Sequence, residues 1–124
     1  MLPPPFQARH IEYSLICSAD DDPAPPTDRL ISIAIDAAEH ARHLALAEVS
    51  ARMPFPPFYP DVWPGEHYRF LAGLVLTLNP KTIIEIGTGS GLSALALKKP
   101  LREDGRIITF DTTPWNRFPD TCLR

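Results

Sequence analysis

The sequence predicts an α/β fold with parallel strands. Two short apolar runs, residues 82–86 and 106–111, are the predicted strands, and a glycine-rich loop and a helical segment separate them. This order is that of a βαβ unit, in which the crossover helix packs back on the sheet with a right-handed turn. Neither run alternates cleanly between apolar and polar residues, which is typical of parallel strands covered on both faces.

A helix is predicted ahead of this unit, from residue 27 to about residue 52. Thr27 can cap it, and Asp28 places a negative charge in the first turn, where the helix dipole favours one. Apolar residues recur at helical spacing and define the expected buried face. These residues are Ile31, Ile35, Ala38, Ala41, Ala45 and Val49.

Prolines divide the rest of the chain. There are 15 of them, clustered at residues 3–5, 23–26 and 54–64, and these clusters predict extended connectors. Residues 6–19 are expected to form a weak strand or an irregular arm. A helix over residues 66–78 precedes the first strand, and a crossover helix over residues 92–99 ends before Pro100. The aromatic stretch 55–63 is either a packed linker or the lining of a flat substrate's pocket.

A site for a nucleotide-type ligand is predicted at the loop between the strands. Gly87, Gly89 and Gly91 lack Cβ atoms, so the backbone can turn sharply and a ligand can approach it closely. The N–H groups at the start of the next helix point into the same loop. Asp111, about 20 residues beyond the last glycine, ends the second strand and can accept hydrogen bonds from two ribose hydroxyls.

The loop differs from the two common phosphate-binding patterns. A P-loop ends in Gly-Lys-Ser/Thr, which is absent, and a dinucleotide fold has the spacing Gly-x-Gly-x-x-Gly. Here the third glycine comes one residue early, and Glu85, two residues before Gly87, would repel a pyrophosphate. Glu85 therefore favours a ligand without a phosphate near the loop, including a cationic one, and disfavours an NAD-dependent enzyme.

The run from Glu85 to Gly91, followed by Ser93 and the strand that ends at Asp111, resembles motif I and the acidic second-strand end of class I S-adenosylmethionine-dependent methyltransferases. Among these it is most similar to small-molecule O-methyltransferases of the catechol and caffeoyl-CoA kind. The resemblance covers roughly residues 62–113. It implies a Rossmann-like fold, S-adenosyl-L-methionine as the cofactor, and methyl transfer to an oxygen of a small molecule.

The resemblance also implies roles for single residues. The loop glycines would cradle the methionine part of the cofactor, Asp111 would hold the ribose, and Glu85 would order the loop or meet the methionine ammonium. Thr112 departs from the family pattern, because the residue after the acid is usually apolar and packs on adenine. The residues expected to bind the cofactor are Gly65, Glu85, Gly87, Thr88, Gly89, Gly91, Ser93 and Asp111.

Two regions are expected. Residues 1–61 form a proline-rich arm and a helix, which resembles the helices that this family uses to cover the active site or to dimerise. Residues 62–124 form a partial, Rossmann-like cofactor domain. The family fold continues well beyond Asp111, so the chain is expected to be truncated after the second core strand, to contain no catalytic residue and to be inactive alone. The alternatives are a non-catalytic remnant that completes its sheet with another chain, and a βαβ unit without a ligand.

Composition limits the partners. The net charge is −3 and the basic residues are scattered, so no nucleic-acid surface is predicted. The longest apolar run, residues 71–78, is too short to span a membrane.

His40 and His43 lack a third ligand, so no metal site is predicted. Cys17 and Cys122 have no metal or redox spacing, which indicates reduced thiols and a cytoplasmic protein. The expected partners are a small-molecule methyl acceptor and a second chain, either as a homodimer or as a complementing polypeptide.

Overall fold

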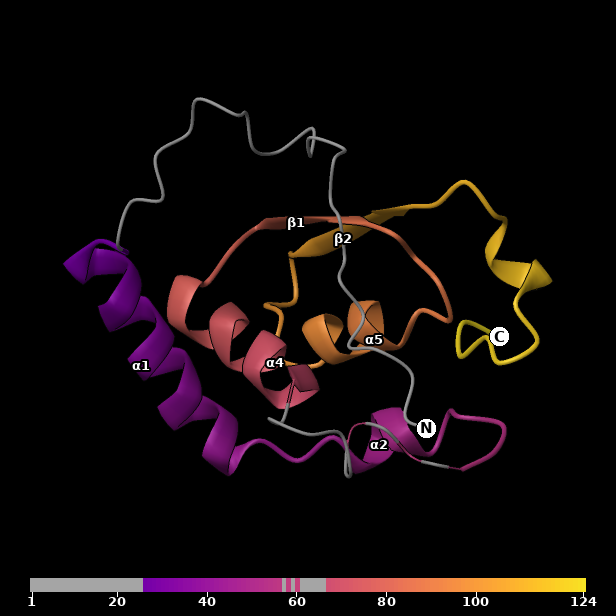
Figure 1. Cartoon of the computed structure of the whole chain (residues 1–124), viewed down its shortest axis with the longest axis horizontal. Coiled ribbons are helices and arrows are strands. Elements are labelled where there is room, and N and C mark those ends of the chain that lie inside the picture. Colours follow the sequence, from indigo (N-terminus) through magenta and orange to yellow (C-terminus); the bar gives the residue numbers. More distant parts are fainter. Residues whose placement is uncertain (1–25, 57, 59, 61–66) are drawn as a thin grey trace, which may run out of the picture.

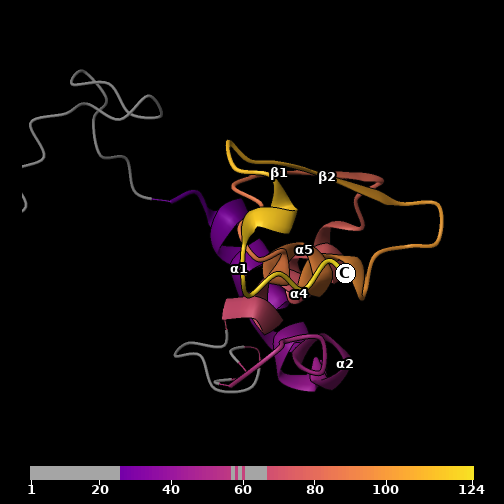
Figure 2. The same ribbon diagram turned by 90° about the vertical axis from the view of Figure 1, so that its right-hand side faces the viewer.

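The computed structural model describes residues 26–56, 58, 60 and 67–124. Strands β1 (Thr82–Ile86) and β2 (Arg106–Phe110) form one layer, and the helices of the described part lie on one side of it (Figures 1 and 2). The helices are α1 (Asp28–His43), α2 (Ala47–Ser50), α4 (His67–Leu78) and α5 (Leu92–Lys98), with a short 3-10 turn η2 (Trp115–Arg117). Gly65, Cys17 and most of the aromatic stretch lie outside the described residues.

The predicted α/β arrangement is confirmed. β1 and β2 pair in parallel, with Thr82 opposite Arg106 and Ile86 opposite Phe110, and α5 connects them. Helix α4 ends at Leu78 because Asn79 adopts a left-handed conformation (φ 45°) and Pro80 follows. Asparagine tolerates that conformation better than most residues. Asparagine and proline at this position thus determine where α4 ends.

The predicted single helix from residue 27 to residue 52 is wrong in one respect, because it is broken in two. Its start is confirmed, since the backbone N–H of Leu30 donates to the Thr27 hydroxyl at 3.2 Å. The helix ends at His43, because Leu44 is extended (φ −87°, ψ 128°), and α2 begins at Ala47. The break turns the side chain of Leu46 into the core, where it is only 1% exposed.

The buried face of α1 differs in part from the predicted one. Ala41 is buried as expected, but Ile31 and Ile35 are exposed, and Ala37 is buried in their place. These alanines face Gly73 of α4, where an added Cβ would lie 3.0 Å from the carbonyl carbon of Ala37. The two helices therefore approach through their smallest residues, which leaves the large side chains of α1 on the outside.

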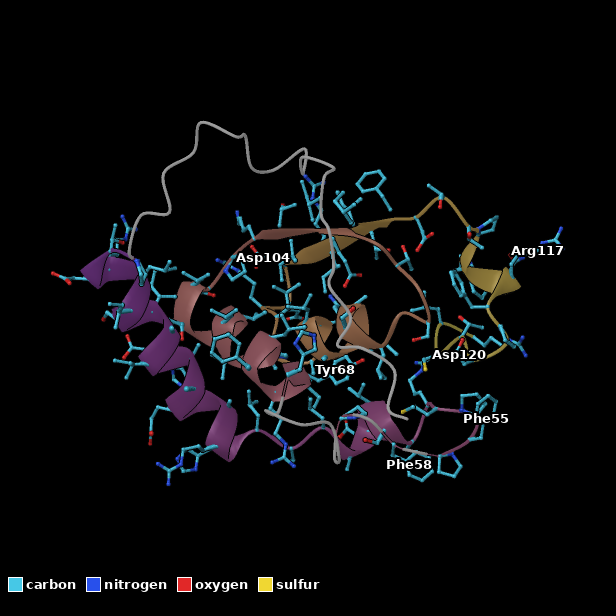
Figure 3. The ribbon with its side chains drawn as sticks, viewed as in Figure 1. Phe55, Phe58, Tyr68, Asp104, Arg117 and Asp120 are labelled. Carbon is cyan, nitrogen blue, oxygen red and sulfur yellow. The ribbon has the colours of Figure 1, made fainter. Side chains whose placement is uncertain are left out.

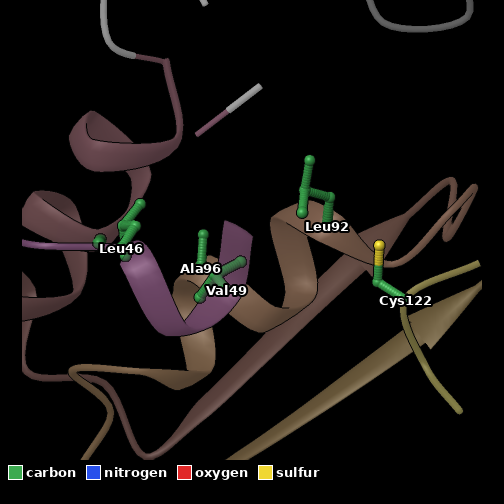
Figure 4. Close-up of a cluster of buried hydrophobic side chains, with 6 residues drawn as sticks. Leu46, Val49, Leu92, Ala96 and Cys122 are labelled. Atoms are coloured by element: carbon green, nitrogen blue, oxygen red, sulfur yellow. The ribbon is translucent and has the colours of Figure 1, made fainter. Parts of the chain in front are cut away.

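The core is small and joins four segments of the chain. Leu46 and Val49 come from the region of α2, and they pack with residues of α4, α5 and the segment after η2 (Figure 4). The complete buried cluster is Leu46, Val49, Ala72, Leu92, Ala96 and Cys122. Cys122 thus anchors the end of the described chain in the same core that holds α2.

One face of the sheet is uncovered among the described residues. Ile84 and Ile86 are 65% and 82% exposed, and Ile108 and Phe110 beside them are exposed too. The intervening residues of both strands, such as Glu85, are half-buried toward the helices. The expectation of strands covered on both faces is therefore wrong for this part of the chain.

Candidate cofactor site

The glycine loop connects β1 to α5 and has a backbone that only glycine adopts readily. The φ angles of Gly87, Gly89 and Gly91 are 95°, 50° and 84°. At such positive φ angles the backbone of a residue with a Cβ atom is strained. The N–H of Gly87 donates to the carbonyl of Phe110 at 2.7 Å, and that of Gly91 donates to the carbonyl of Thr88 at 2.8 Å. A Cβ on Gly87 or Gly89 would meet nothing within 4 Å, so this side of the loop is open to a ligand.

Asp111 links the end of β2 to this loop. Its carboxylate accepts hydrogen bonds from the backbone N–H of Gly89 at 2.9 Å and from that of Thr113 at 2.8 Å. These donors, Gly89 first, hold the pKa of Asp111 below its usual value of 3.8. The side chain is exposed, and an ionised carboxylate has about four acceptor positions. Asp111 can therefore accept further hydrogen bonds from a ligand.

A hydrogen bond between Glu85 and Ser93 connects β1 to α5. The Ser93 hydroxyl donates to Oε1 of Glu85 at 2.5 Å. The second oxygen, Oε2, is inaccessible and has no hydrogen-bond partner among the described residues. A buried carboxylate oxygen without a donor is unfavourable, so a water or a bound donor at this position would stabilise the site.

Thr88 contributes differently from the neighbouring glycines. Its side chain is buried, and its hydroxyl is hydrogen-bonded to the hydroxyl of Thr109 on β2. The side chain therefore holds the loop against the sheet. Any contact of Thr88 with a ligand on the open side of the loop would come from its backbone.

Asp111 lines two hollows. One, of about 370 Å³, is lined by apolar side chains and the start of the loop, namely Ile86, Gly87, Phe110, Asp111 and Thr112. The other, of about 290 Å³, is lined by Thr88, Thr109, Asp111, Thr113, Pro114, Trp115 and Leu123. Ile86 and Phe110 were not predicted from the sequence as lining residues. Their position at the carboxyl ends of two paired strands could have indicated them.

Other kinds of site are less well supported. In the part of the chain that the structure describes, no group of three or more metal-ligating side chains lies together. His43 lies 3.6 Å from Glu39 on the exposed side of α1. Within the same residues, no helix has the length and apolar character needed to cross a membrane. Phe55 and Phe58 are exposed beside α2 and line neither hollow at Asp111 (Figure 3).

Comparison with known proteins decides the family. A family model described as O-methyltransferase matches residues 31–117, which include most of α1, the glycine loop and β2. The chain belongs to the O-methyltransferase family. This confirms the resemblance that the motif from Glu85 to Gly91 indicated. No curated protein and no solved structure gives a significant match to this O-methyltransferase family member.

The structure brings most of the expected cofactor residues of this O-methyltransferase family member together. Gly87, Gly89 and Asp111 share the open side of the loop, and they are joined by the hydrogen bond from Gly89. Glu85 and Ser93 form a second pair behind them. Gly91 is the N-cap residue that precedes α5, and the side chain of Leu123 covers it. The role expected for Gly65 falls outside the described residues.

Proposed function

We propose that the segment from β1 to Asp111 binds S-adenosyl-L-methionine, and that the chain serves methyl transfer to an oxygen of a small molecule. One observation carries the proposal: an exposed, ionised carboxylate is hydrogen-bonded to the glycine loop through Gly89 in a member of the O-methyltransferase family. This arrangement places acceptors for hydroxyl groups beside a backbone that a ligand can approach closely.

The residues around the loop fit such a cofactor. The open space above Gly87 and Gly89 leaves room for an amino-acid moiety, and Asp111 offers acceptors to a ribose diol. Ile86 and Phe110 supply apolar walls where a purine ring can pack, which offsets the polar Thr112. The charge of Glu85 disfavours ligands with a phosphate at this position.

The chemistry divides between the ligand and the protein. S-adenosyl-L-methionine supplies an electrophilic methyl group on a sulfonium, so the protein needs chiefly to align the acceptor, exclude water and deprotonate its oxygen. Asp111 is unsuited to that deprotonation, because its lowered pKa makes it a weak base at neutral pH. We therefore assign Asp111 to binding and not to proton transfer.

Calorimetric titration with S-adenosylhomocysteine tests this proposal. The chain should bind this ligand and should bind NAD at least tenfold more weakly. Asp111→Asn should weaken binding about tenfold or more, because it replaces a charged hydrogen-bond acceptor by a neutral amide. Asp104→Asn is the matched control, since Asp104 is an exposed aspartate in the turn before β2 whose partners are Arg102 and Lys81. Equal affinity of the wild type and Asp111→Asn, or tighter binding of NAD, would overturn the proposal.

A further inference from the structure

The segment after η2, residues 118–124, packs against the glycine loop. The backbone N–H of Cys122 donates to the carbonyl of Ser90 at 2.8 Å. The side chain of Leu123 covers Gly91, where an added Cβ would lie 2.6 and 2.7 Å from its two methyl carbons. The second half of the loop, Ser90 and Gly91, is therefore supported by residues that are distant in sequence.

Arg52 holds this segment from the other side. Its Nε donates to the carbonyl of Cys122 at 2.9 Å, and its terminal nitrogen donates to the backbone oxygen of Arg124. The backbone of Cys122 is thus held in both directions, because its N–H donates to Ser90 and its carbonyl accepts from Arg52. Guanidinium donors have a fixed planar arrangement, so two such bonds define the orientation of the backbone that accepts them.

Arg52 is exposed, but its backbone is hydrogen-bonded to a residue of the core. Its backbone N–H donates to the carbonyl of Val49 at 3.1 Å. Val49 is buried in the same cluster as Cys122 (Figure 4). Arg52 thus connects the region of α2 to residues 122–124 by charge-assisted hydrogen bonds. The connection spans 70 residues of sequence.

We infer that Arg52 is a positioning residue for the glycine loop: it holds Cys122 and Leu123, which in turn hold Ser90 and Gly91 in the conformation that the cofactor needs. The inference rests on the proposed function for its consequence, since the loop is the proposed cofactor site. Arg52 lies in the region that the sequence assigned to an arm and a covering or dimerising helix, and it lines neither hollow beside Asp111.

Amide hydrogen exchange in the full chain, measured by NMR without ligand, tests the connection. In Arg52→Gln, the amides of Cys122 and Gly91 should exchange at least tenfold faster, while that of Val75 in α4 should not change. Arg52→Lys should restore part of the protection, because lysine retains the charge but not the planar pair of donors. Arg102→Gln is the control, since Arg102 is an arginine bonded to Asp104 in the turn before β2.

Affinity then tests the consequence for the cofactor. S-adenosylhomocysteine should bind Arg52→Gln about tenfold more weakly than the wild type, with Arg52→Lys between them. A second variant, Leu123→Ala, should speed exchange at Gly91 while leaving the Arg52 bonds in place. Unchanged exchange at Gly91 in Arg52→Gln would overturn the inference, and so would faster exchange without loss of affinity. If the wild type binds no S-adenosylhomocysteine, the proposed function fails, and exchange at Gly91 still decides whether Arg52 positions the loop.

Discussion

Replacing Gly73 by alanine tests how α1 and α4 pack. On an exposed helix surface this change would stabilise the chain by about 1 kcal/mol, because alanine has the higher helix propensity. Here the added Cβ would lie 3.0 Å from the carbonyl carbon of Ala37 and 3.2 Å from the backbone nitrogen of Ala41, and the oxygen of Ala37 is closer still. These are backbone atoms, so no change of rotamer can relieve the contact.

The magnitude follows from two opposing effects. Overpacking of a well-packed contact costs about 1–3 kcal/mol, and a rigid backbone neighbour places this case at or above the upper end of that range. Allowing for the gain in helix propensity, we expect the free energy of unfolding to fall by about 2 kcal/mol. Urea denaturation followed by circular dichroism should show a lower midpoint with an unchanged slope.

A matched control separates propensity from packing. Ala38 is exposed on α1, so Ala38→Gly should cost about 1 kcal/mol from propensity alone. If Gly73→Ala raises the urea midpoint by the amount that Ala38→Gly lowers it, the close crossing of the two helices at Gly73 is refuted.

Three further predictions concern the loop, its acid and the first helix cap. Gly91→Ala should destabilise the chain more than Gly89→Ala, since both positions are left-handed but only a Cβ at position 91 meets Leu123. The difference in urea midpoint between the two variants should become smaller when Leu123 is also replaced by alanine. An unchanged difference would contradict the contact between position 91 and Leu123. The wild type should have a higher free energy of unfolding than Asp111→Asn above about pH 4, and this difference should disappear in acid. The reason is that the folded-state pKa of Asp111 lies below its usual 3.8, so protonation in acid removes the stabilising charge. An equal difference at acid and neutral pH would show that ionisation is not involved. Thr27→Ala should cost about 1 kcal/mol and Thr27→Gly only a few tenths, measured as loss of helical signal and of stability.

Local sequence signals predicted the βαβ unit well. The bounds of β1 were predicted correctly, and β2 ends one residue earlier than expected. Gly87, Asn79 and Pro80 impose backbone conformations that depend little on distant contacts. The same applies to Thr27, whose capping hydrogen bond lies within a single turn.

Features that depend on distant contacts were not predicted. Hydrophobic periodicity predicted Ala41 as buried correctly, but it also favoured the large residues Ile31 and Ile35, whereas the space left by Gly73 accommodates Ala37. The break after His43 has no glycine or proline to indicate it, and it follows from the burial of Leu46.

The candidate site shows the same division between local and distant contacts. The glycine loop and Asp111 are recognisable from their spacing in the sequence. The hydrogen bond from Arg52 to Cys122 joins residues 70 positions apart, and no local sequence pattern predicts it. Contacts of this kind depend on the packing of the whole chain, so only a structure reveals them.

The bare side of the sheet has a practical consequence for studies of ligand affinity. Four exposed apolar side chains lie together on this face of the two paired strands: Ile84, Ile86, Ile108 and Phe110. Exposed apolar surfaces of this type promote self-association. At the concentrations used in calorimetry, heat from dissociating oligomers would add to the heat of titration. Sedimentation at the working concentration, compared with a variant Ile84→Lys on the same face, would separate the two sources of heat, because Ile84 lines neither hollow at Asp111.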